Sequence, residues 1–200
     1  MNLELFAIAL GAYFIGSFPA GVLAARIAHI EIRTSGSGNI GATNVARTAG
    51  RWLGGLTLLL DIAKGALPVA LAQMLASSTQ PITSLADPGI VAGAAAFAGH
   101  IFPPALGFRG GKGVATALGV IAALAPGALI VPLILFAFLV GITRQVSLGS
   151  VAAALIGPIA AQMAGYPAPI VVLMAVLGAA ILIRHKENLS RLRAGEEPRF

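Results

Sequence analysis

The sequence contains no cysteine and little charge, since Asp, Glu, Lys and Arg make up 10% of its 200 residues. Without cysteine the chain can form no disulfide and no thiolate site. A soluble domain carries about 25% charged residues, and this chain has too few to cover a surface in water. Aromatic residues reach only 6%, and the net charge of +6 is not accompanied by the aromatic-plus-basic pattern of a nucleic-acid surface. The composition excludes a soluble fold, thiol chemistry and nucleic-acid binding.

Hydrophobic residues make up 58% of the chain, and its mean hydropathy is +0.92. A helix needs roughly 17 to 25 mostly apolar residues to cross a bilayer. Tyr166–Ile183 is a short candidate, with Pro167 and Pro169 in its first turn, where proline is tolerated. Four longer segments meet the requirement directly: Leu3–Ala25, Leu53–Ala76, Gly89–Leu106 and Val146–Ala164.

The stretch Val114–Ile142 forms either one long helix or two helices that turn at Pro126-Gly127. Lys and Arg concentrate on the cytoplasmic side of a membrane, and only the split places the basic loops and the basic tail on one side. We therefore predict a single all-α polytopic membrane domain over residues 1–200. It has seven transmembrane helices, with the N-terminus outside and the C-terminus cytoplasmic. Because Val114–Ala125 is too short to cross about 30 Å of hydrocarbon, we expect its helix to start near Gly111 or its outer end to dip into the membrane.

The first cytoplasmic loop combines alternating glycines with polar side chains. Glycines allow successive backbone N–H groups to converge on an anion. Arg47 adds a guanidinium whose shape matches a phosphate. The alternative is a flexible linker, which the Asn, Thr and Arg residues among the glycines disfavour. The loop is predicted to bind a phosphate through Arg47 and through Ser37, Gly38, Asn39, Gly41, Thr43 and Asn44.

The second loop contains Gly110-Gly111-Lys112-Gly113 ahead of an apolar helix. It differs from a Walker A loop, because Gly113 stands where that motif needs Ser or Thr and no strand precedes it. The turn still aims N–H groups and the Lys112 ammonium at an anion. The alternative is a lysine placed only by the positive-inside rule. His100, near the end of an apolar span, is as consistent with a structural role as with a catalytic one.

The third segment follows the last span and contains His185 and Asn188. Their i, i+3 spacing puts them on one helix face if the helix continues. The alternative is a basic stop that binds anionic lipid heads. Ser150 enters a span after Arg144 and either reaches the same site or bonds its own i−4 carbonyl. Inside another span, the spacing of Asp61 and Lys64 predicts an internal ion pair, with a functional role as the less favoured alternative.

Several common chemistries lack their residues. Three scattered histidines do not provide metal-ligand spacing, and no Ser-His-Asp arrangement is evident. No histidine is followed by aspartate after four intervening residues, the His-x4-Asp pattern of acyl-CoA-dependent glycerolipid acyltransferases. The acidic signature of CDP-alcohol phosphotransferases is also missing. We expect no metal and no other cofactor.

Together the three motifs resemble the bacterial acyl-phosphate:glycerol-3-phosphate acyltransferases. The matching residues are Gly36–Asn44, the Gly-His-x-Phe-Pro and Phe-x-Gly-Gly-Lys-Gly-Val-Ala-Thr motifs within Gly99–Thr116, and His185–Leu192. The resemblance extends over nearly the whole chain. It implies acyl transfer from acyl phosphate to glycerol 3-phosphate in the bacterial cytoplasmic membrane, with a site facing the cytoplasm. It also implies a substrate site formed by Ser37, Arg47, Lys112, Ser150, His185 and Asn188.

A mixed anhydride is already activated, so no acyl-enzyme is required. The proton acceptor is either His185 or the substrate's own phosphate. Expected partners are the two substrates, membrane lipid and a soluble enzyme that makes acyl phosphate. Two alternatives are a small transporter of phosphate esters and a scaffold that recruits soluble lipid-synthesis proteins. The sequence lacks the two related halves that many transporters show, which counts against the first alternative.

Overall fold

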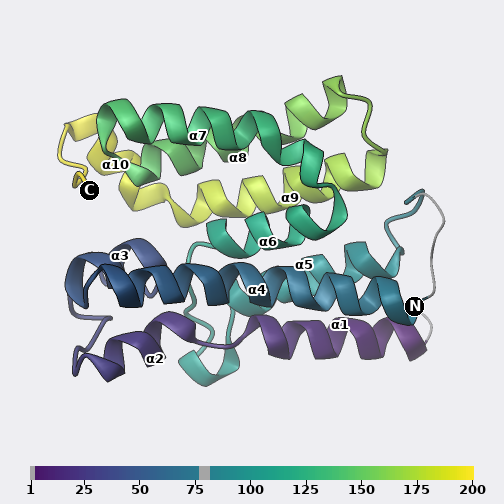
Figure 1. Ribbon diagram of the computed structural model, residues 1–200, viewed down its shortest axis with the longest axis horizontal. Helices are drawn as coiled ribbons and strands as arrows, with labels where there is room; N and C mark the ends of the chain where they lie inside the picture. Colours follow the sequence, from purple (N-terminus) through teal and green to yellow (C-terminus); the bar gives the residue numbers. More distant parts are fainter. Residues whose placement is uncertain (1–2, 77–81) are drawn as a thin grey trace.

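The computed structural model describes residues 3–76 and 82–200, and within these ranges every regular element is a helix (Figure 1). Proline, glycine and the loop motifs separate the helices. Their bounds are α1 (Leu3–Gly16), α2 (Ala20–Ile27), α3 (Ala42–Thr48), α4 (Arg51–Leu75), α5 (Pro88–Ile101), the 3-10 turn η1 (Pro104–Leu106), α6 (Val114–Leu124), the 3-10 turn η2 (Pro126–Leu129), α7 (Ile130–Thr143), α8 (Val146–Met163), α9 (Ala168–Arg184) and α10 (Lys186–Ala194).

Within the described residues, five helical segments are long and apolar enough to cross a membrane. They are Leu3–Ile27, Arg51–Leu75, Pro88–Leu106, Pro126–Thr143 and Val146–Met163. A sixth candidate is the pair α9 and α10, which is bent by 59°. Helix α6 is apolar but has only 11 residues. Five of the predicted spans therefore coincide with segments that can cross a membrane, and the last predicted span coincides with α9. The predicted span before Pro126 coincides with the short helix α6, as its sequence indicates.

The helices form two groups that face each other across α6 (Figure 1). In the first group α1 packs on α5, and α4 packs on α5 and α6. In the second group α7 packs on α8, and α8 packs on α9. The short helix α3 packs on the start of α4, and α10 follows α9 near the C-terminal tail (Figure 1). This arrangement leaves space for a site between the two groups.

The side chains are distributed in the opposite sense to a water-soluble protein. Large apolar side chains point outward, such as Leu59, Met74, Ile134 and Phe138, each more than 60% exposed. Polar and ionisable side chains are instead buried: Thr57, Asp61, Lys64, His100, Thr116, Ser147, Ser150, His185, Asn188 and Glu197. An apolar exterior around a polar interior matches a protein whose solvent is lipid.

Proline marks two of the helix breaks, and glycine sets the start of α6. The split at Pro126 is confirmed, because α6 ends at Leu124 and η2 starts at Pro126. The span predicted over Leu3–Ala25 matches the candidate span Leu3–Ile27, but its helix is broken before Pro19, and α2 starts at Ala20. The predicted helix start near Gly111 is wrong. Gly113 has φ 87°, a left-handed conformation that a right-handed helix cannot contain, so α6 starts at Val114.

Small residues allow the helices of the first group to touch through their backbones. A Cβ on Gly16 of α1 would overlap the carbonyl of Ala96 on α5, and one on Gly99 would overlap the carbonyl of Tyr13. In the second group, Gly178 of α9 lies against the Ala154 backbone of α8. Such contacts between small residues are typical of helices that pack in lipid.

Candidate active site

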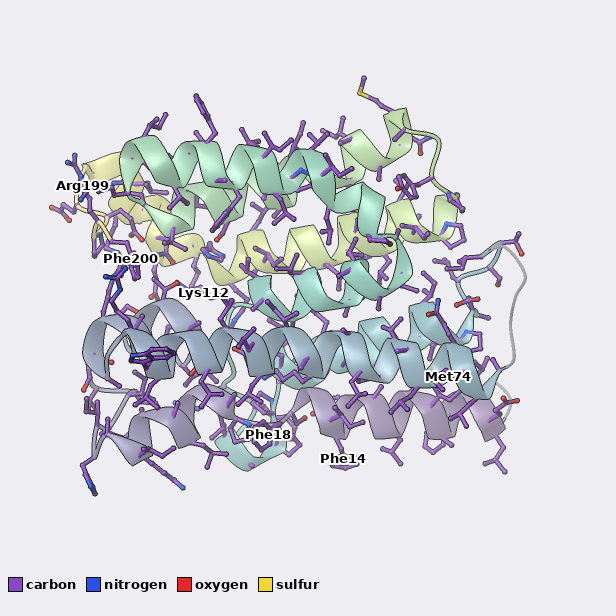
Figure 2. All side chains as sticks on the ribbon, in the orientation of Figure 1. Phe14, Phe18, Met74, Lys112, Arg199 and Phe200 are labelled. Carbon is purple, nitrogen blue, oxygen red and sulfur yellow. The ribbon has the colours of Figure 1, made fainter. Side chains whose placement is uncertain are left out.

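A cavity of about 960 Å³ lies between the two helix groups. Its polar lining comes mainly from the three loop motifs, together with residues such as Asp61, Ser150 and Glu197. Its apolar lining comes from α6, α7, α8 and α9, through residues such as Leu118, Phe136, Ala154 and Leu177. In Figure 2, Arg199 and Phe200 lie at the left end of the bundle, Met74 lies toward the right end, and Lys112 lies further inside than Arg199. The cavity thus joins a charged region to an apolar chamber.

The predicted site residues converge on this cavity although they come from distant parts of the chain. The structure places these in its lining: Ser37, Asn39, Gly41, Thr43, Asn44, Arg47, Lys112, Gly113, Ser150, His185 and Asn188. Three predicted residues, Gly38, Gly110 and Gly111, are not among the residues that line it. The inference that the basic loops meet at one place is therefore confirmed in geometry.

Asn44 organises the first loop. Its Nδ2 donates to the carbonyls of Ser35 and Asn39 at 3.0 and 2.8 Å, and its Oδ1 accepts from the Ser37 N–H at 2.9 Å. Gly36 and Gly38 adopt left-handed φ values of 59° and 68°, which permit these tight turns. Since its amide is bonded to the loop, Asn44 shapes the site, and the expectation of a free side-chain donor for substrate is wrong.

Fewer backbone N–H groups of the first loop are available to bind an anion than the glycine pattern predicts. The N–H groups of Ser37 and Gly41 donate to Asn side chains, and that of Gly38 donates to the Ser35 carbonyl at 3.0 Å. These three groups are bonded within the loop. The loop's other donors, such as the Ser37 hydroxyl and the Arg47 guanidinium, remain to bind an anion.

Arg47 lies on α3 and faces the C-terminal tail. Its guanidinium donates to the Pro198 carbonyl at 3.1 Å and lies 5.9 Å from the centre of the Phe200 ring. An aromatic ring holds a cation more weakly than a carboxylate in an ion pair does. No carboxylate forms an ion pair with Arg47 among the described residues, so its charge is free to meet an anion.

The second loop is fixed from both sides. Arg184, at the end of α9, donates to the carbonyls of Gly111 and Gly110 at 3.1 and 2.7 Å. Arg33 of the first loop donates to the Arg109 carbonyl at 2.7 Å. The loop also packs on the His100 ring so closely that a Cβ on Gly111 would overlap it. Gly110 and Gly111 thus serve the backbone path that positions Lys112, and do not line the cavity.

Lys112 projects from this loop into the cavity and donates to Asn188 Oδ1. Burial lowers the pKa of its ammonium from 10.5 to about 8, while the charge of Glu197 acts in the opposite direction. A lysine with this pKa is still mostly protonated at neutral pH. It is therefore a cation in a poorly solvated place, where its attraction for an anion is stronger than in water.

His185 lies where α9 ends and α10 begins. The helix bends by 59° here, so the continuous helix on which its shared face with Asn188 depended is wrong. Both side chains are nevertheless buried and line the cavity. His185 Nδ1 lies 2.8 Å from the Ile181 carbonyl, which can only accept a hydrogen bond. The proton therefore sits on Nδ1, and Nε2 carries the lone pair.

Of the remaining polar residues, Ser150 lines the cavity with the motif residues, and Asp61, Lys64 and His100 lie together in the interior. Ser150 Oγ donates to the Val146 carbonyl at 2.8 Å, as its i−4 alternative predicts, and still lines the cavity. Lys64 and Asp61 form the predicted ion pair at 2.8 Å, and Lys64 also donates to the Phe18 carbonyl at the α1–α2 break. His100 Nδ1 is buried 3.8 Å from Asp61 Oδ1, beyond hydrogen-bonding distance.

Sequence reasoning missed two residues that shape the site, Arg184 and Glu197. Glu197 is 7% exposed and lines the cavity, where it accepts from Asn188 at 2.6 Å and from Arg191 at 2.9 Å. A carboxylate in a basic tail gives little local signal, and only the folding of the tail over the cavity brings it there. Among the described residues, no group of three His, Asp or Glu side chains is placed to hold a metal ion.

Comparison with known proteins identifies the family. The family model described as glycerol-3-phosphate acyltransferase matches residues 6–195. The chain belongs to this family. The glycerol-3-phosphate acyltransferase of Geobacter sulfurreducens is 45% identical over 94% of both chains. That of Geobacter metallireducens is 47% identical over 100% of this chain and 99% of its own.

Solved structures of the family agree with this fold. The crystal structure of PlsY (YgiH), an integral membrane glycerol 3-phosphate acyltransferase, in its glycerol 3-phosphate form, is 37% identical to this chain with a TM-score of 0.90. The comparison covers 98% of this chain and 95% of that one. The lysophosphatidic acid form gives a TM-score of 0.87 at 36% identity over the same shares. The chain is therefore an integral membrane acyltransferase of this family.

Proposed function

We propose that the protein transfers a fatty acyl group from acyl phosphate to glycerol 3-phosphate, giving 1-acyl-glycerol 3-phosphate and inorganic phosphate. The observation that carries this proposal is a cavity that combines a basic region with an apolar chamber. Acyl phosphate has the same two parts, a charged head and an apolar tail. Relatives named glycerol-3-phosphate acyltransferase, and solved forms with glycerol 3-phosphate and lysophosphatidic acid, support the acceptor and the product.

Two cations bring the anionic reactants together. Both substrates carry phosphate groups that repel each other, and Arg47 and Lys112 line the same cavity from different loops. Their charges offset this repulsion in a poorly solvated site. Ser37 and Ser150 add hydroxyl groups to the same lining. With the acceptor hydroxyl held next to the anhydride carbonyl, positioning alone contributes several kcal/mol, roughly 7 at the lower bound for well-oriented reactants.

The chemical step is direct transfer. The acceptor hydroxyl oxygen forms a bond to the acyl carbon, and the bond from that carbon to the phosphate oxygen breaks with its electron pair leaving on phosphate. The hydroxyl proton passes to His185 Nε2 or to a substrate phosphate. The neutral ring with its lone pair on Nε2 supports the first route, because Nδ1 is engaged by the Ile181 carbonyl. No covalent acyl-enzyme is needed, since the donor is already activated.

The proposal also includes the membrane topology and the side of the membrane that the site faces. Seven spans, with the short α6 as one of them, place the N-terminus outside and the C-terminus in the cytoplasm of a bacterial inner membrane. The basic residues of loops and tail favour this orientation. The site then faces the cytoplasm, where a soluble enzyme that makes acyl phosphate can deliver the donor.

The activity test uses the purified protein with acyl phosphate and glycerol 3-phosphate, and it measures phosphate release together with the acylated product. A parallel reaction with acyl-CoA tests the choice of donor. Turnover with acyl phosphate and none with acyl-CoA is the expected result. Flux of glycerol 3-phosphate through proteoliposomes without any acylated product would favour a transporter and reject the proposal.

The orientation test uses the absence of cysteine from the natural sequence, because each single-cysteine variant then carries one thiol. Exposed positions are available in each region: Thr34, Arg109 and Arg193 on the basic side, and Ala86 between α4 and α5. An impermeant maleimide added to intact cells is expected to label Ala86→Cys and to spare the other three. Labelling of Thr34→Cys and Arg109→Cys from opposite sides would end the proposed topology.

A further inference from the structure

The C-terminal tail folds back over the charged end of the cavity. After α10 the chain turns at Gly195, which has φ 74°. The Phe200 N–H then donates to the Arg144 carbonyl at 2.7 Å, and Gln145 Nε2 donates to the Glu197 carbonyl at 3.3 Å. Arg47 donates to the Pro198 carbonyl at 3.1 Å. Figure 2 shows Phe200 and Arg199 at this end of the molecule. The tail is therefore fastened to two other parts of the site.

This fastening places the Glu197 carboxylate inside the site. Its Oε1 accepts from Asn188 Nδ2 at 2.6 Å, and its Oε2 accepts from Arg191 Nε at 2.9 Å. Asn188 in turn accepts from the Lys112 ammonium through Oδ1. The four side chains form one continuous series of hydrogen bonds, from the Arg191 guanidinium to the Lys112 ammonium. Lys112 and Asn188 are residues that the sequence predicts for the site, but the carboxylate that joins Asn188 to Arg191 is not.

The chemistry of the two ends fixes the amide in the middle. A carboxylate can only accept hydrogen bonds, and an ammonium can only donate them. Asn188 must therefore turn Nδ2 toward Glu197 and Oδ1 toward Lys112. In the flipped amide, the NH₂ group would face the donor Lys112 and the carbonyl oxygen would face the acceptor Glu197. Without the carboxylate, Nδ2 loses its partner and only the Lys112 ammonium itself orients the amide, so the acceptor of the lysine is held in place less firmly.

We propose that Glu197 is a positioning residue for acyl transfer, which acts through Asn188 to hold the Lys112 ammonium in place and protonated. This inference rests on the proposed function, because Lys112 is given its role there. Glu197 itself touches neither substrate in this scheme. Its contribution is the orientation of the amide and a negative charge near the lysine.

The charges around Lys112 indicate how the loss of Glu197 appears in a pH profile. Burial lowers the pKa of Lys112, Glu197 and Glu187 oppose that effect, and Arg191 and Arg184 add to it. Removing the Glu197 charge is therefore expected to lower the pKa of Lys112 further. Because kcat/KM for glycerol 3-phosphate follows the protonated lysine, its decline at high pH should begin at a lower pH in the variant.

The test compares Glu197→Gln, Glu197→Ala and Glu197→Asp with the neighbouring control Glu196→Gln, which is exposed. Activities are measured per mole of monodisperse protein over a range of pH. Glu197→Gln and Glu197→Ala are expected to lose about tenfold or more in kcat/KM, the effect of one charged hydrogen bond. The decline of kcat/KM at high pH, the alkaline limb of the profile, should begin at a lower pH in both variants. Glu197→Asp keeps the charge and should restore the limb in part. Glu196→Gln should match the wild type.

Three outcomes would overturn the inference. An unchanged kcat/KM and alkaline limb in Glu197→Gln would show that the carboxylate does not act on Lys112. A reduced yield of folded protein with normal kinetics would make Glu197 merely structural. A rise in activity would make it a competitor of the anionic substrates. If Glu197→Ala fails to fold, the near-isosteric Gln and Asp variants still decide the question. An inactive wild type would instead reject the proposed function.

Discussion

Replacing Lys112 with methionine separates the role of this charge from its role in folding. Methionine keeps an unbranched side chain and removes the ammonium that lines the cavity and bonds Asn188. Removing one preorganised group that stabilises developing charge costs about 3–4 kcal/mol, which corresponds to 10²–10³ in rate. We therefore expect Lys112→Met to lower kcat/KM for glycerol 3-phosphate by about 10²–10³.

Stability should respond differently. The pKa of Lys112 falls from 10.5 to about 8 on folding, so the protonated lysine opposes folding by about 3 kcal/mol at pH 7. This cost is complete below pH 8 and vanishes above 10.5, where both states are neutral. Methionine removes it but leaves Asn188 Oδ1 without a donor, at about 1–3 kcal/mol. The two effects nearly cancel, and the Tm is expected to stay close to that of the wild type.

Lys64→Met is the matched control. Lys64 pairs with Asp61 at 2.8 Å in the interior and donates to the Phe18 carbonyl at 2.9 Å. Removing it leaves a buried carboxylate unpaired, which costs about 3–5 kcal/mol. Circular dichroism melts and phosphate-release assays in the same detergent compare the variants. The reasoning fails if Lys112→Met keeps near wild-type activity, or if its Tm falls as far as that of Lys64→Met.

Three further predictions concern the same site. For the wild type, kcat/KM should decline as pH rises above about 8, where Lys112 loses its proton, and Lys112→Arg should extend the active range upward. His185→Gln should lower kcat by about 10²–10⁴ at similar KM, and retention of most of kcat would assign the proton to a substrate phosphate. Gly111→Ala should abolish activity because its Cβ would overlap the His100 ring, whereas Gly141→Ala, with open space around its Cβ, should leave phosphate release unchanged.

The fold was largely predictable because hydropathy and charge act over long segments. A bilayer selects runs of apolar residues, and the requirement for basic loops on one side revealed the break at Pro126. The break before Pro19 was missed since the surrounding residues stay apolar through it. Its stability depends on Lys64, 46 residues away, which donates to the Phe18 carbonyl. Such a long-range partner leaves no trace in a local hydropathy pattern.

The sequence predicted which residues lie at the site better than it predicted what each of them does there. Glycine, arginine and lysine motifs located Arg47 and Lys112 because anions need donors and positive charge, whereas Asn188 was located by its spacing to His185 and by the family resemblance. The assignment of Asn44 as a substrate donor was wrong, because a short amide can satisfy its own loop equally well. Glu197 was missed since its position depends on how the tail folds back. Spacing along the chain does not determine which polar groups bind a ligand and which bind each other.

The backbone contacts between α4 and α6 make the two walls of the cavity mechanically unequal. Gly65 and Gly119 leave no gap into which either helix can slide, and Gly16 and Gly99 lock α1 to α5 in the same helix group. By contrast, only 11% of the residues of Pro126–Thr143 are buried. We expect the wall formed by α7 to yield when a long acyl chain enters, while the opposite wall stays rigid and keeps Lys112 in register.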